Sequence, residues 1–371
     1  AALNGPVFLL TDPAATNPAV SGAKGANLAH MKQAGLPVPD AFIVPTEAFR
    51  MAINDLPKHA LNALKEDPSD AAHIVTDGLR NGALFNSWLD TLGKAYTALG
   101  SRAVSARSSS TAEDLAKASF AGQYETVLNI VDLNGLVDGI GRVWASHFSP
   151  HAQDYRRRHR ISEEGAMAVV VQRQIASRAS GVLFTRDPQS GAKRCVISAA
   201  LGQGEGVVSG RAPTDHWVVS PADGTVLSTE IADKHLRIEA RAEGGLNTVE
   251  VEAEQRSAPA LQPEHIAQLT QLGVRIEALF TGAQDIEFSV DEAIHILQAR
   301  PITTIEEVAE PDAPWEEGID PTYCWTKSRG PFTRLEQDYM IEYMAHARAC
   351  YEEVGSRMTA KHLYHMCNGY M

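Results

Sequence analysis

The chain has 371 residues, of which 44% are hydrophobic and 21% are charged, as is ordinary for a folded protein. This length exceeds what one compact core holds, so two or three domains are expected. The formal net charge of −13 argues against a general nucleic-acid or anionic-membrane surface. An anionic ligand would therefore need a local cationic pocket or a metal ion.

The cysteines and the hydropathy pattern predict a cytoplasmic protein. Cys195, Cys324, Cys350 and Cys367 are widely spaced, which favours reduced thiols over a disulfide framework. The first residues, "AALNGPVFLL", lack the basic start and long apolar core of a secretory signal. No apolar run approaches the roughly 20 residues of a membrane span.

The first 165 residues are expected to mix helices with short strands. The segment "SGAKGANLAHMKQAGLPVPDAFIVPTEAFR" predicts a loop, a helix ended by Gly35, a strand "AFIV" and a second helix capped by Thr46. Residues 56–100 are predicted to be helical, and "RAVSARSSS" a strand that runs into a serine-rich loop. After a strand "ETVLNI", apolar residues at helical spacing predict a helix over residues 132–148.

The pattern changes after about residue 165. Short runs rich in β-branched residues, such as "AMAVVVQRQI", "GVLFTR" and "HWVVS", alternate with turns and predict a mainly antiparallel sheet. A helix starting at Pro263 is expected to cover that sheet. The acidic segment over residues 306–322 resembles a linker, and residues 323–371 the start of a helical domain or tail.

The hairpin "DIEFSVDEAIHILQARPIT" carries polar groups inside an apolar pattern. Alternation places Asp285 and Glu287 opposite their apolar neighbours, and puts Gln298 and Arg300 on a common face. Carboxylate and amide oxygens suit Mg²⁺, which usually keeps waters and shares phosphate oxygens. The alternative is a purely structural Glu287–Arg300 salt bridge.

Two loops carry cations that suit a phosphate ligand. Lys24 lies between glycines ahead of a predicted helix, and Arg107 is followed by four hydroxyl side chains. The alternatives are a plain helix start with a solvated lysine, and a helix cap from Ser110 or Thr111 with Glu113. The segment "LGQGEGVVSG" is not a dinucleotide fingerprint, because Val207 stands where a glycine is needed; its glycines are expected to form a tight loop carrying Glu205.

Two other clusters suggest no site. The run "RRRHR" at residues 156–160 is interpreted as a solvated helix face. His362, His365 and Cys367, near the chain end, make only a weak case for zinc.

Taken in order, five segments resemble the N-terminal nucleotide-binding domain of phosphoenolpyruvate synthase and pyruvate phosphate dikinase. They begin "GAKGANLAHM", "ARSSSTAED", "VVVQRQIAS", "LGQGEGVVSG" and "DIEFSVDEA", and the similarity spans residues 5–304. The same domain occurs in rifampin phosphotransferase, in phenylphosphate synthase and in prodigiosin-type condensing enzymes. The resemblance implies an α+β, two-lobed ATP-grasp fold, with lobes at residues 1–165 and 166–305 and ATP held between them.

The resemblance also implies roles for individual residues. Lys24 and Arg107 correspond to cations that grip the ATP phosphates, Arg300 to an arginine beside them, and Glu287 and Gln298 to the Mg²⁺ ligands. The other implied contacts with ATP are Gly122 and Thr126 in a covering loop, Gln172 and the backbone through Ile175 beside adenine, and Glu205 in the second lobe. The sequence departs from the family at "SGAKG", where Ala23 replaces a glycine, and at "VSARSSS", which is longer than usual.

The implied function is a dikinase-type phosphotransferase that binds Mg-ATP. Family members pass phosphate from ATP to a histidine on a swivelling domain, with release of AMP and phosphate, and from there to an acceptor such as pyruvate, a phenol or an antibiotic hydroxyl. The usual histidine loop is not found in this sequence, so the chain is expected to be a fragment or one subunit. The alternatives are an ATP-dependent condensing enzyme or ligase of the same family, and a non-catalytic nucleotide sensor.

Overall fold

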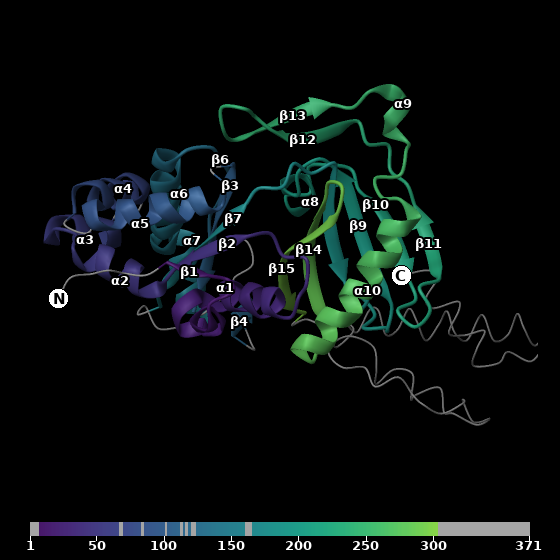
Figure 1. The fold of residues 1–371 in the computed structure, drawn as a ribbon, viewed down its shortest axis with the longest axis horizontal. Helices are drawn as coiled ribbons and strands as arrows, with labels where there is room; N and C mark the ends of the chain where they lie inside the picture. The colour runs from purple at the N-terminus through teal and green to yellow at the C-terminus, as the bar shows by residue number, and fades with distance from the viewer. Residues whose placement is uncertain are drawn as a thin grey trace, which may run out of the picture. The chain divides into compact units, whose positions relative to one another are not determined.

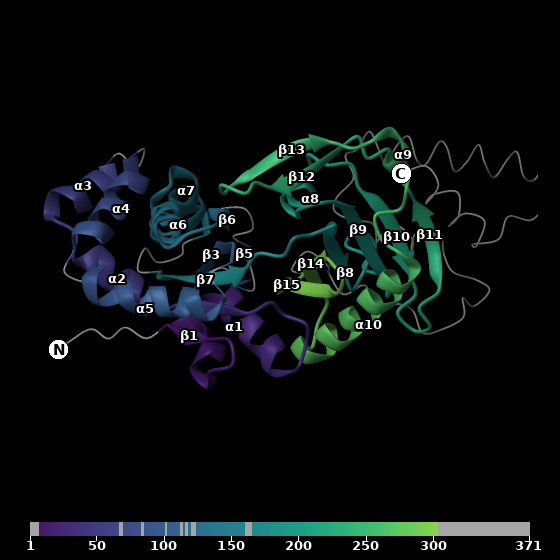
Figure 2. The same ribbon diagram turned by 45° about the horizontal axis from the view of Figure 1, so that its top comes forward.

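The computed structural model describes residues 7–302, except 67–69, 83–84, 101, 112–113, 116–117, 120–123 and 160–164. The described chain is an α+β protein built around two antiparallel sheets (Figures 1 and 2). We call residues 7–173 the first half and residues 178–302 the second half, after the sheet that each builds. The predicted linker at 306–322 and the helix predicted beyond it lie outside the described residues.

The first half contains a five-stranded sheet with helices packed on it. Its strands follow the order β1 (Phe8–Leu9), β2 (Ala41–Val44), β7 (Met167–Arg173), β3 (Val104–Ser110) and β6 (Thr126–Ile130). Its helices are α1 (Pro18–Gln33), α2 (Thr46–Asn54), α3 (Lys58–Glu66), α4 (Ala71–Asn81), α5 (Phe85–Ala98), α6 (Leu133–Ala145) and α7 (Pro150–His159), with 3₁₀ turns at Pro13–Thr16 and Ser146–Phe148. A two-stranded ribbon joins β4 (Asp114–Leu115) to β5 (Ala118–Ser119).

Strand β7 belongs to the first sheet, which extends the first half beyond the boundary expected at residue 165. It pairs with β2 on one side and β3 on the other. Its residues alternate between two cores: Val169 and Val171 pack in the core formed with the helices α2 to α6, and Ala168 and Val170 in the core formed with α1. Composition alone placed this strand in the second half, because its β-branched run resembles the strands that follow it.

The second half is a six-stranded antiparallel sheet with one long helix across it. Its strands follow the order β11 (Val226–Glu230), β10 (Asp215–Val219), β9 (Cys195–Leu201), β8 (Ala179–Phe184), β14 (Gln284–Val290) and β15 (Ile294–Pro301). The helix α10 (Pro263–Phe280) covers one face (Figure 1), and the short helices α8 (Glu205–Val208) and α9 (Ala253–Arg256) lie in loops. The predicted antiparallel sheet and covering helix are thus confirmed.

A separate hairpin of β12 (Leu236–Ala240) and β13 (Leu246–Glu250) projects from the second half. Both views show it extending toward β6 of the first half (Figures 1 and 2). An isolated parallel bridge between Gly202 and Ile238, the middle residue of β12, attaches the hairpin to the loop after β9.

One apolar core runs through both halves. Leu28 and Met31 of α1 belong to the same buried cluster as Ile197, Phe288 and Ile296 of the second sheet. Backbone contacts reinforce this join, since the Ile296 N–H donates to the carbonyl of Pro37 (2.9 Å). The two sheets are therefore fixed to each other along α1 and β15.

Two local predictions about the first half were wrong. The helix expected after Lys24 begins earlier, at Pro18, and is interrupted at Gly22, which has φ 66°. The serines after Arg107 do not form a loop, because Ser108, Ser109 and Ser110 continue β3 and pair with β7. Ser110 pairs with Met167 at the end of β3, and the Thr111 N–H donates to the carbonyl of Ala166 (3.1 Å). The helix cap considered with Glu113 involves a residue outside the described part of the chain.

The arginine run also differs from its predicted solvated face. Arg157 and Arg158 are exposed on α7, but Arg156 is only 5% exposed and donates to the carbonyl of His147 (2.7 Å). None of the described helices has the length and apolarity needed to cross a bilayer.

Candidate functional site

The kink in α1 holds Lys24 against the first sheet. A Cβ atom on Gly22 would lie 2.0 Å from the backbone oxygen of Ser109, so only glycine permits this approach. The Ser109 hydroxyl donates to the carbonyl of Ser21 (2.6 Å) and accepts from the N–H of Gly25 (2.8 Å). These contacts fasten both sides of the turn that carries Lys24 to strand β3.

The face of the first sheet beside α1 also carries Arg107 and Gln172, two of the other residues predicted for this half. Arg107 lies opposite Thr126 on β6 and Val170 on β7. Gln172 lies opposite Ser105 in the same ladder and is 1% exposed. Alternation puts Ser105, Arg107 and Gln172 on one face of the sheet.

The hairpin of β14 and β15 has the predicted polar strip. Asp285 pairs with Arg300 and Glu287 pairs with Gln298 across the two strands, which confirms that the four side chains share a face. The register shifts between Glu287 and Phe288, where β15 contains the additional residue Leu297. This bulge turns the carbonyl of Leu297 out of the ladder, and Arg107 donates to it (3.3 Å).

Arg107 joins the two halves through the hairpin. Its Nη2 forms an ion pair with Oε2 of Glu287 and donates to Oε1 of Gln298 (3.2 Å). Side chains in the ion pair are 10% and 21% exposed, so water screens the pair only partly. Arg300 pairs with Asp285 instead, through Nη2 and Oδ2 (2.6 Å), so the predicted Glu287–Arg300 alternative is not the pairing observed.

The pKa values of the two carboxyl groups move in opposite directions. Burial opposes ionisation of Glu287, but the charges of Arg107, Lys24 and Arg300 together lower its pKa below the ordinary value. Burial raises the pKa of Asp285, and the Glu287 charge adds to that rise against the effect of Arg300. Because the Lys24 charge contributes to the lowered pKa of Glu287, Lys24 acts electrostatically on this cluster. Glu287 is therefore the fixed negative charge of the site.

The oxygens of Glu287 and Gln298 converge on a single point, now held by the Nη2 atom of Arg107. Convergent oxygens from a carboxylate and an amide are what a magnesium ion needs from a protein, because it takes its remaining ligands from water and phosphate. No group of three or more acidic, histidine or cysteine side chains forms a metal cluster in the described part of the chain. The donor set fits a shared Mg²⁺ site and not a closed, all-protein cage.

Gln172 brings an unused donor to the same face. Its Nε2 atom is buried and has no hydrogen-bond partner among the described residues. Such an atom is costly unless a ligand satisfies it. After it, β7 leaves the first sheet through residues 174–177, which connect the halves and include Ile175, 5% exposed.

The structure does not bring every predicted residue into the cluster. Glu205 begins α8, and its carboxylate pairs with Arg211 in the same loop (3.2 Å). Thr126 is exposed at the start of β6. Gly122 lies outside the described residues. Sequence reasoning missed the roles of Ser109 and of the Leu297 carbonyl, and only the extra hydroxyl in "ARSSS" hinted at the first.

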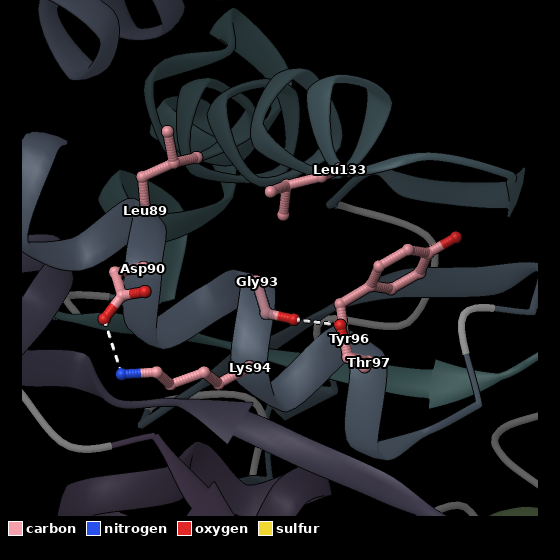
Figure 3. A pocket seen from close by; sticks show the side chains of 7 residues that line it. All are labelled: Leu89, Asp90, Gly93, Lys94, Tyr96, Thr97 and Leu133. Carbon is pink, nitrogen blue, oxygen red and sulfur yellow. Dashed lines mark hydrogen bonds and ion pairs between the residues drawn. The ribbon is translucent and has the colours of Figure 1, made fainter.

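A surface hollow on the first half lies apart from these residues (Figure 3). It is lined by α5 residues and by Leu133 at the start of α6. Asp90 and Lys94 pair with each other there (2.6 Å), and Tyr96 donates to the carbonyl of Val131 (2.9 Å). None of the residues predicted for the site lines this hollow.

Fold and site together define an α+β protein that holds a cation-rich, carboxylate-containing cluster between two antiparallel sheets. The family model described as the pyruvate phosphate dikinase AMP/ATP-binding domain matches residues 19–319. The chain belongs to this family, as the sequence motifs predicted.

Curated relatives show how widely the domain is used. The chain is 38% identical over 306 residues to a rifampicin phosphotransferase of Streptomyces sviceus, covering 79% of this chain and 35% of that protein. It is 34% identical over 316 residues to a probable phosphoenolpyruvate synthase of Archaeoglobus fulgidus (81% and 42%). It is 33% identical over 325 residues to the prodigiosin synthesizing transferase PigC of Serratia marcescens (86% and 35%). The chain thus spans less than half the length of these relatives.

Proposed function

We propose that this chain is the Mg-ATP-binding part of a dikinase-type phosphotransferase with a two-lobed ATP-grasp fold. In the proposed reaction, a histidine on a separate domain or subunit receives one phosphoryl group from ATP. Water takes a second, so that AMP and inorganic phosphate leave. Membership in the AMP/ATP-binding domain family supports the nucleotide, and the names of the relatives support phosphoryl transfer.

The observation that carries this proposal is the convergence on Arg107. A cation from the first half contacts a carboxylate and an amide oxygen from the second half at one point. Lys24 acts electrostatically on the same carboxylate. Cations next to convergent oxygens suit a metal-bound polyphosphate, because the cations bind the phosphate oxygens and the protein oxygens bind the metal.

Each residue then has a defined task. Glu287 and Gln298 would hold Mg²⁺, which when bound neutralises phosphate charge and orients the oxygens. Arg107 would exchange its contacts with these two residues for contacts with phosphate oxygens. Lys24 and Arg300 would offset the charge that develops on the transferred group.

The nucleotide base is assigned to the segment between the sheets. The unsatisfied Nε2 of Gln172 would donate to the nucleotide, and residues through Ile175 would line the base. Glu205, Gly122 and Thr126 are proposed as further contacts from the surrounding loops. The final acceptor is proposed to be a small molecule with an oxygen nucleophile, such as an enol, a phenol or an alcohol, which is the chemistry common to pyruvate, phenols and antibiotic hydroxyls.

Binding is tested by isothermal titration of Mg-ATP into the chain and into its Glu287→Gln variant. The variant keeps the side-chain shape but loses the metal-binding charge, so we expect its affinity to fall at least tenfold, which is about 1.4 kcal/mol. Glu230→Gln is the matched control. Glu230 lies in the same row of cross-strand neighbours as Glu287, on the edge strand β11, and it is exposed. Equal binding by all three proteins would contradict the proposed role of Glu287.

Transfer is tested separately, because a nucleotide sensor would also bind Mg-ATP. ATP labelled in its phosphoryl groups is incubated with a longer protein that contains this chain and its histidine domain. Acid-labile, alkali-stable phosphohistidine, together with AMP, is the expected result. Binding without phosphohistidine or AMP would instead identify a sensor.

A further inference from the structure

Three amide side chains connect the two halves on the side of the β12–β13 hairpin. Asn129 lies on β6 of the first half, Gln174 lies in the connecting segment, and Gln203 lies in the loop after β9 of the second half. Asn129 and Gln203 are only 3% and 6% exposed. None of the three side chains was assigned a task in the site described above.

Gln203 fixes the connecting segment to the second half. Its Nε2 donates to the carbonyl of Ile175 (2.9 Å), and its Oε1 is hydrogen-bonded to Nε2 of Gln174. Its own N–H donates to the carbonyl of Ile238 on β12 (2.8 Å). One residue therefore joins the connecting segment, the loop that carries Glu205, and the hairpin.

The carbonyl of Ile175 is fully used in this arrangement. It accepts from Nε2 of Gln203, from the N–H of Ser177 (2.9 Å) and from the Ser177 hydroxyl (3.2 Å). By contrast, no hydrogen bond joins the carbonyl of Gln174 or the N–H of Ala176 to another described residue. An acceptor and a donor two residues apart complement the amino group and ring nitrogen of adenine, whereas the same edge of guanine has these groups reversed.

Asn129 braces the tip of the hairpin from the first half. Its Nδ2 donates to the carbonyls of Arg241 and Gly245 (both 2.7 Å), and its carbonyl accepts from the N–H of Gly245 (3.1 Å). Asn129 has φ 54°, a left-handed conformation that asparagine adopts more readily than most residues other than glycine. Such conformations persist where the surroundings hold them and are common at functional sites.

We propose that Asn129, Gln174 and Gln203 form an amide clasp that sets the connecting segment for recognition of the nucleotide base, with Gln203 as its central positioning residue. The inference rests on the proposed nucleotide-binding function. The clasp holds the Ile175 carbonyl away from the ligand and leaves the neighbouring backbone groups for adenine. The hairpin, held in the middle of β12 by Gln203 and at its tip by Asn129, braces the segment from outside.

The test compares ATP with inorganic triphosphate, which has the phosphates but no base. In the Gln203→Glu variant an oxygen replaces Nε2 and faces the Ile175 carbonyl. We expect the Kd of Mg-ATP to rise about tenfold, the usual scale for one disrupted buried hydrogen bond. The Kd of Mg-triphosphate, measured by competition, should change less than twofold. Gln189→Glu makes the same chemical change at an exposed loop position and should alter neither.

The ratio of the two Kd values separates positioning from general damage. A loss of fold, or repulsion of phosphate by the new carboxylate, would weaken both ligands equally and would overturn the proposal, as would no change in either. If the unsubstituted chain binds neither ligand, the proposed function fails and the clasp inference falls with it. If the unsubstituted chain binds both ligands and the variant has the same ratio of Kd values, only the clasp inference fails.

A second variant tests the brace independently. Asn129→Asp keeps the shape and the tolerance for positive φ but presents oxygen to the carbonyls of Arg241 and Gly245. We expect faster hydrogen exchange of the backbone amides at the hairpin tip and a rise of several-fold in the Kd of Mg-ATP, again with little change for Mg-triphosphate. Unchanged exchange and unchanged ATP affinity would overturn the role of Asn129 in the clasp.

Discussion

Two ion pairs in the described part of the chain differ in how fully their polar atoms are used. In the pair of Asp215 and Lys234, both side chains are 0% exposed and the charged atoms lie 2.7 Å apart. Each oxygen of Asp215 also accepts a backbone N–H, from Ala232 (2.9 Å) and from Ala260 (2.7 Å). This pair connects nearby parts of the second half only.

The pair of Arg107 and Glu287 is arranged differently. It joins residues from the two halves, and Glu287 keeps 21% of its side chain exposed. In the part of the chain that the structure describes, Nε of Arg107 has no hydrogen-bond partner. A third residue, Gln298, directs its oxygen at the same guanidinium atom. An ion pair whose polar atoms are all hydrogen-bonded within the chain is a structural pair. An ion pair that is partly exposed, and toward which a further oxygen is directed, indicates a ligand-binding position.

The largest expected effect concerns the satisfied pair. Asp215→Ala leaves the Lys234 charge buried without its partner and should cost about 3–5 kcal/mol of unfolding free energy, measured by denaturant titration. Glu254→Ala, at an exposed position on α9, should stay within about 0.5 kcal/mol. A small loss from Asp215→Ala would break the comparison, because the buried pair would then not be structural.

At the Arg107–Glu287 pair we expect a large effect on ligand affinity and a smaller effect on stability. Arg107→Gln should reduce Mg-ATP affinity about thirtyfold, or about 2 kcal/mol, because a phosphate-binding charge is lost. The unfolding free energy should fall less than in Asp215→Ala, since Glu287 is partly exposed and Lys24 and Arg300 still act on it. Titration calorimetry and denaturant unfolding of the same samples separate the two effects. A variant that is destabilised but binds normally would reverse the assignment.

The buried, neutral imidazole of His147 predicts how stability changes at acidic pH. Burial, assisted by the nearby Arg156 charge, lowers the pKa of His147 to about 3. The unfolded chain binds a proton near the ordinary value of 6.5 while the folded chain does not, so stability is present above pH 6.5 and is lost as the pH falls toward 3. The expected loss reaches about 1.4 kcal/mol per pH unit.

The measurement is unfolding free energy against pH in His147→Gln and in the exposed-site control His151→Gln. The first variant should show a shallower decline below pH 6.5, and the second should follow the parent chain. Parallel curves for all three proteins would show that His147 takes up its proton in the folded state.

The smallest expected effect is at the turn that carries Lys24. Ser109→Ala removes the hydroxyl that bonds Ser21 and Gly25, and should cost about 1 kcal/mol of unfolding free energy. Mg-ATP affinity should fall a few-fold as Lys24 loses its support. Ser228→Ala, on the exposed edge strand β11, is the control. If Ser109→Ala leaves affinity unchanged, the turn is positioned by Gly22 alone.

Local patterns in the sequence predicted much of this architecture. The alternation in the hairpin gave the common face of Asp285, Glu287, Gln298 and Arg300, and the helix from Pro263 was read from its apolar spacing. These succeed because a period of two or of 3.6 residues is a property of one segment. The family motifs added the expectation that Lys24 and Arg107 act with the hairpin.

The remainder depends on contacts between distant segments, which no local period encodes. The sheet membership of β7, the strand conformation of Ser108–Ser110 and the bulge at Leu297 are all set by strand partners. The burial of Arg156 and the clasp through Asn129 and Gln203 depend on elements that lie far apart in the chain. The hairpin alone could not identify Arg107 as the partner of Glu287, because Arg300 was nearer in sequence.

The apolar core shared by the two sheets limits how a ligand can enter. Each large side chain in that core contributes about 1.5–3 kcal/mol by its burial, so pulling Leu28 and Met31 of α1 away from Ile296 and Phe288 would cost many times the thermal energy. A visiting molecule must therefore be admitted by side-chain rotation and by small movements of loops at the rim. The two sheets are therefore held rigidly together along α1. Access to the polar cluster depends on how readily the Arg107 side chain rotates away from Glu287 and Gln298.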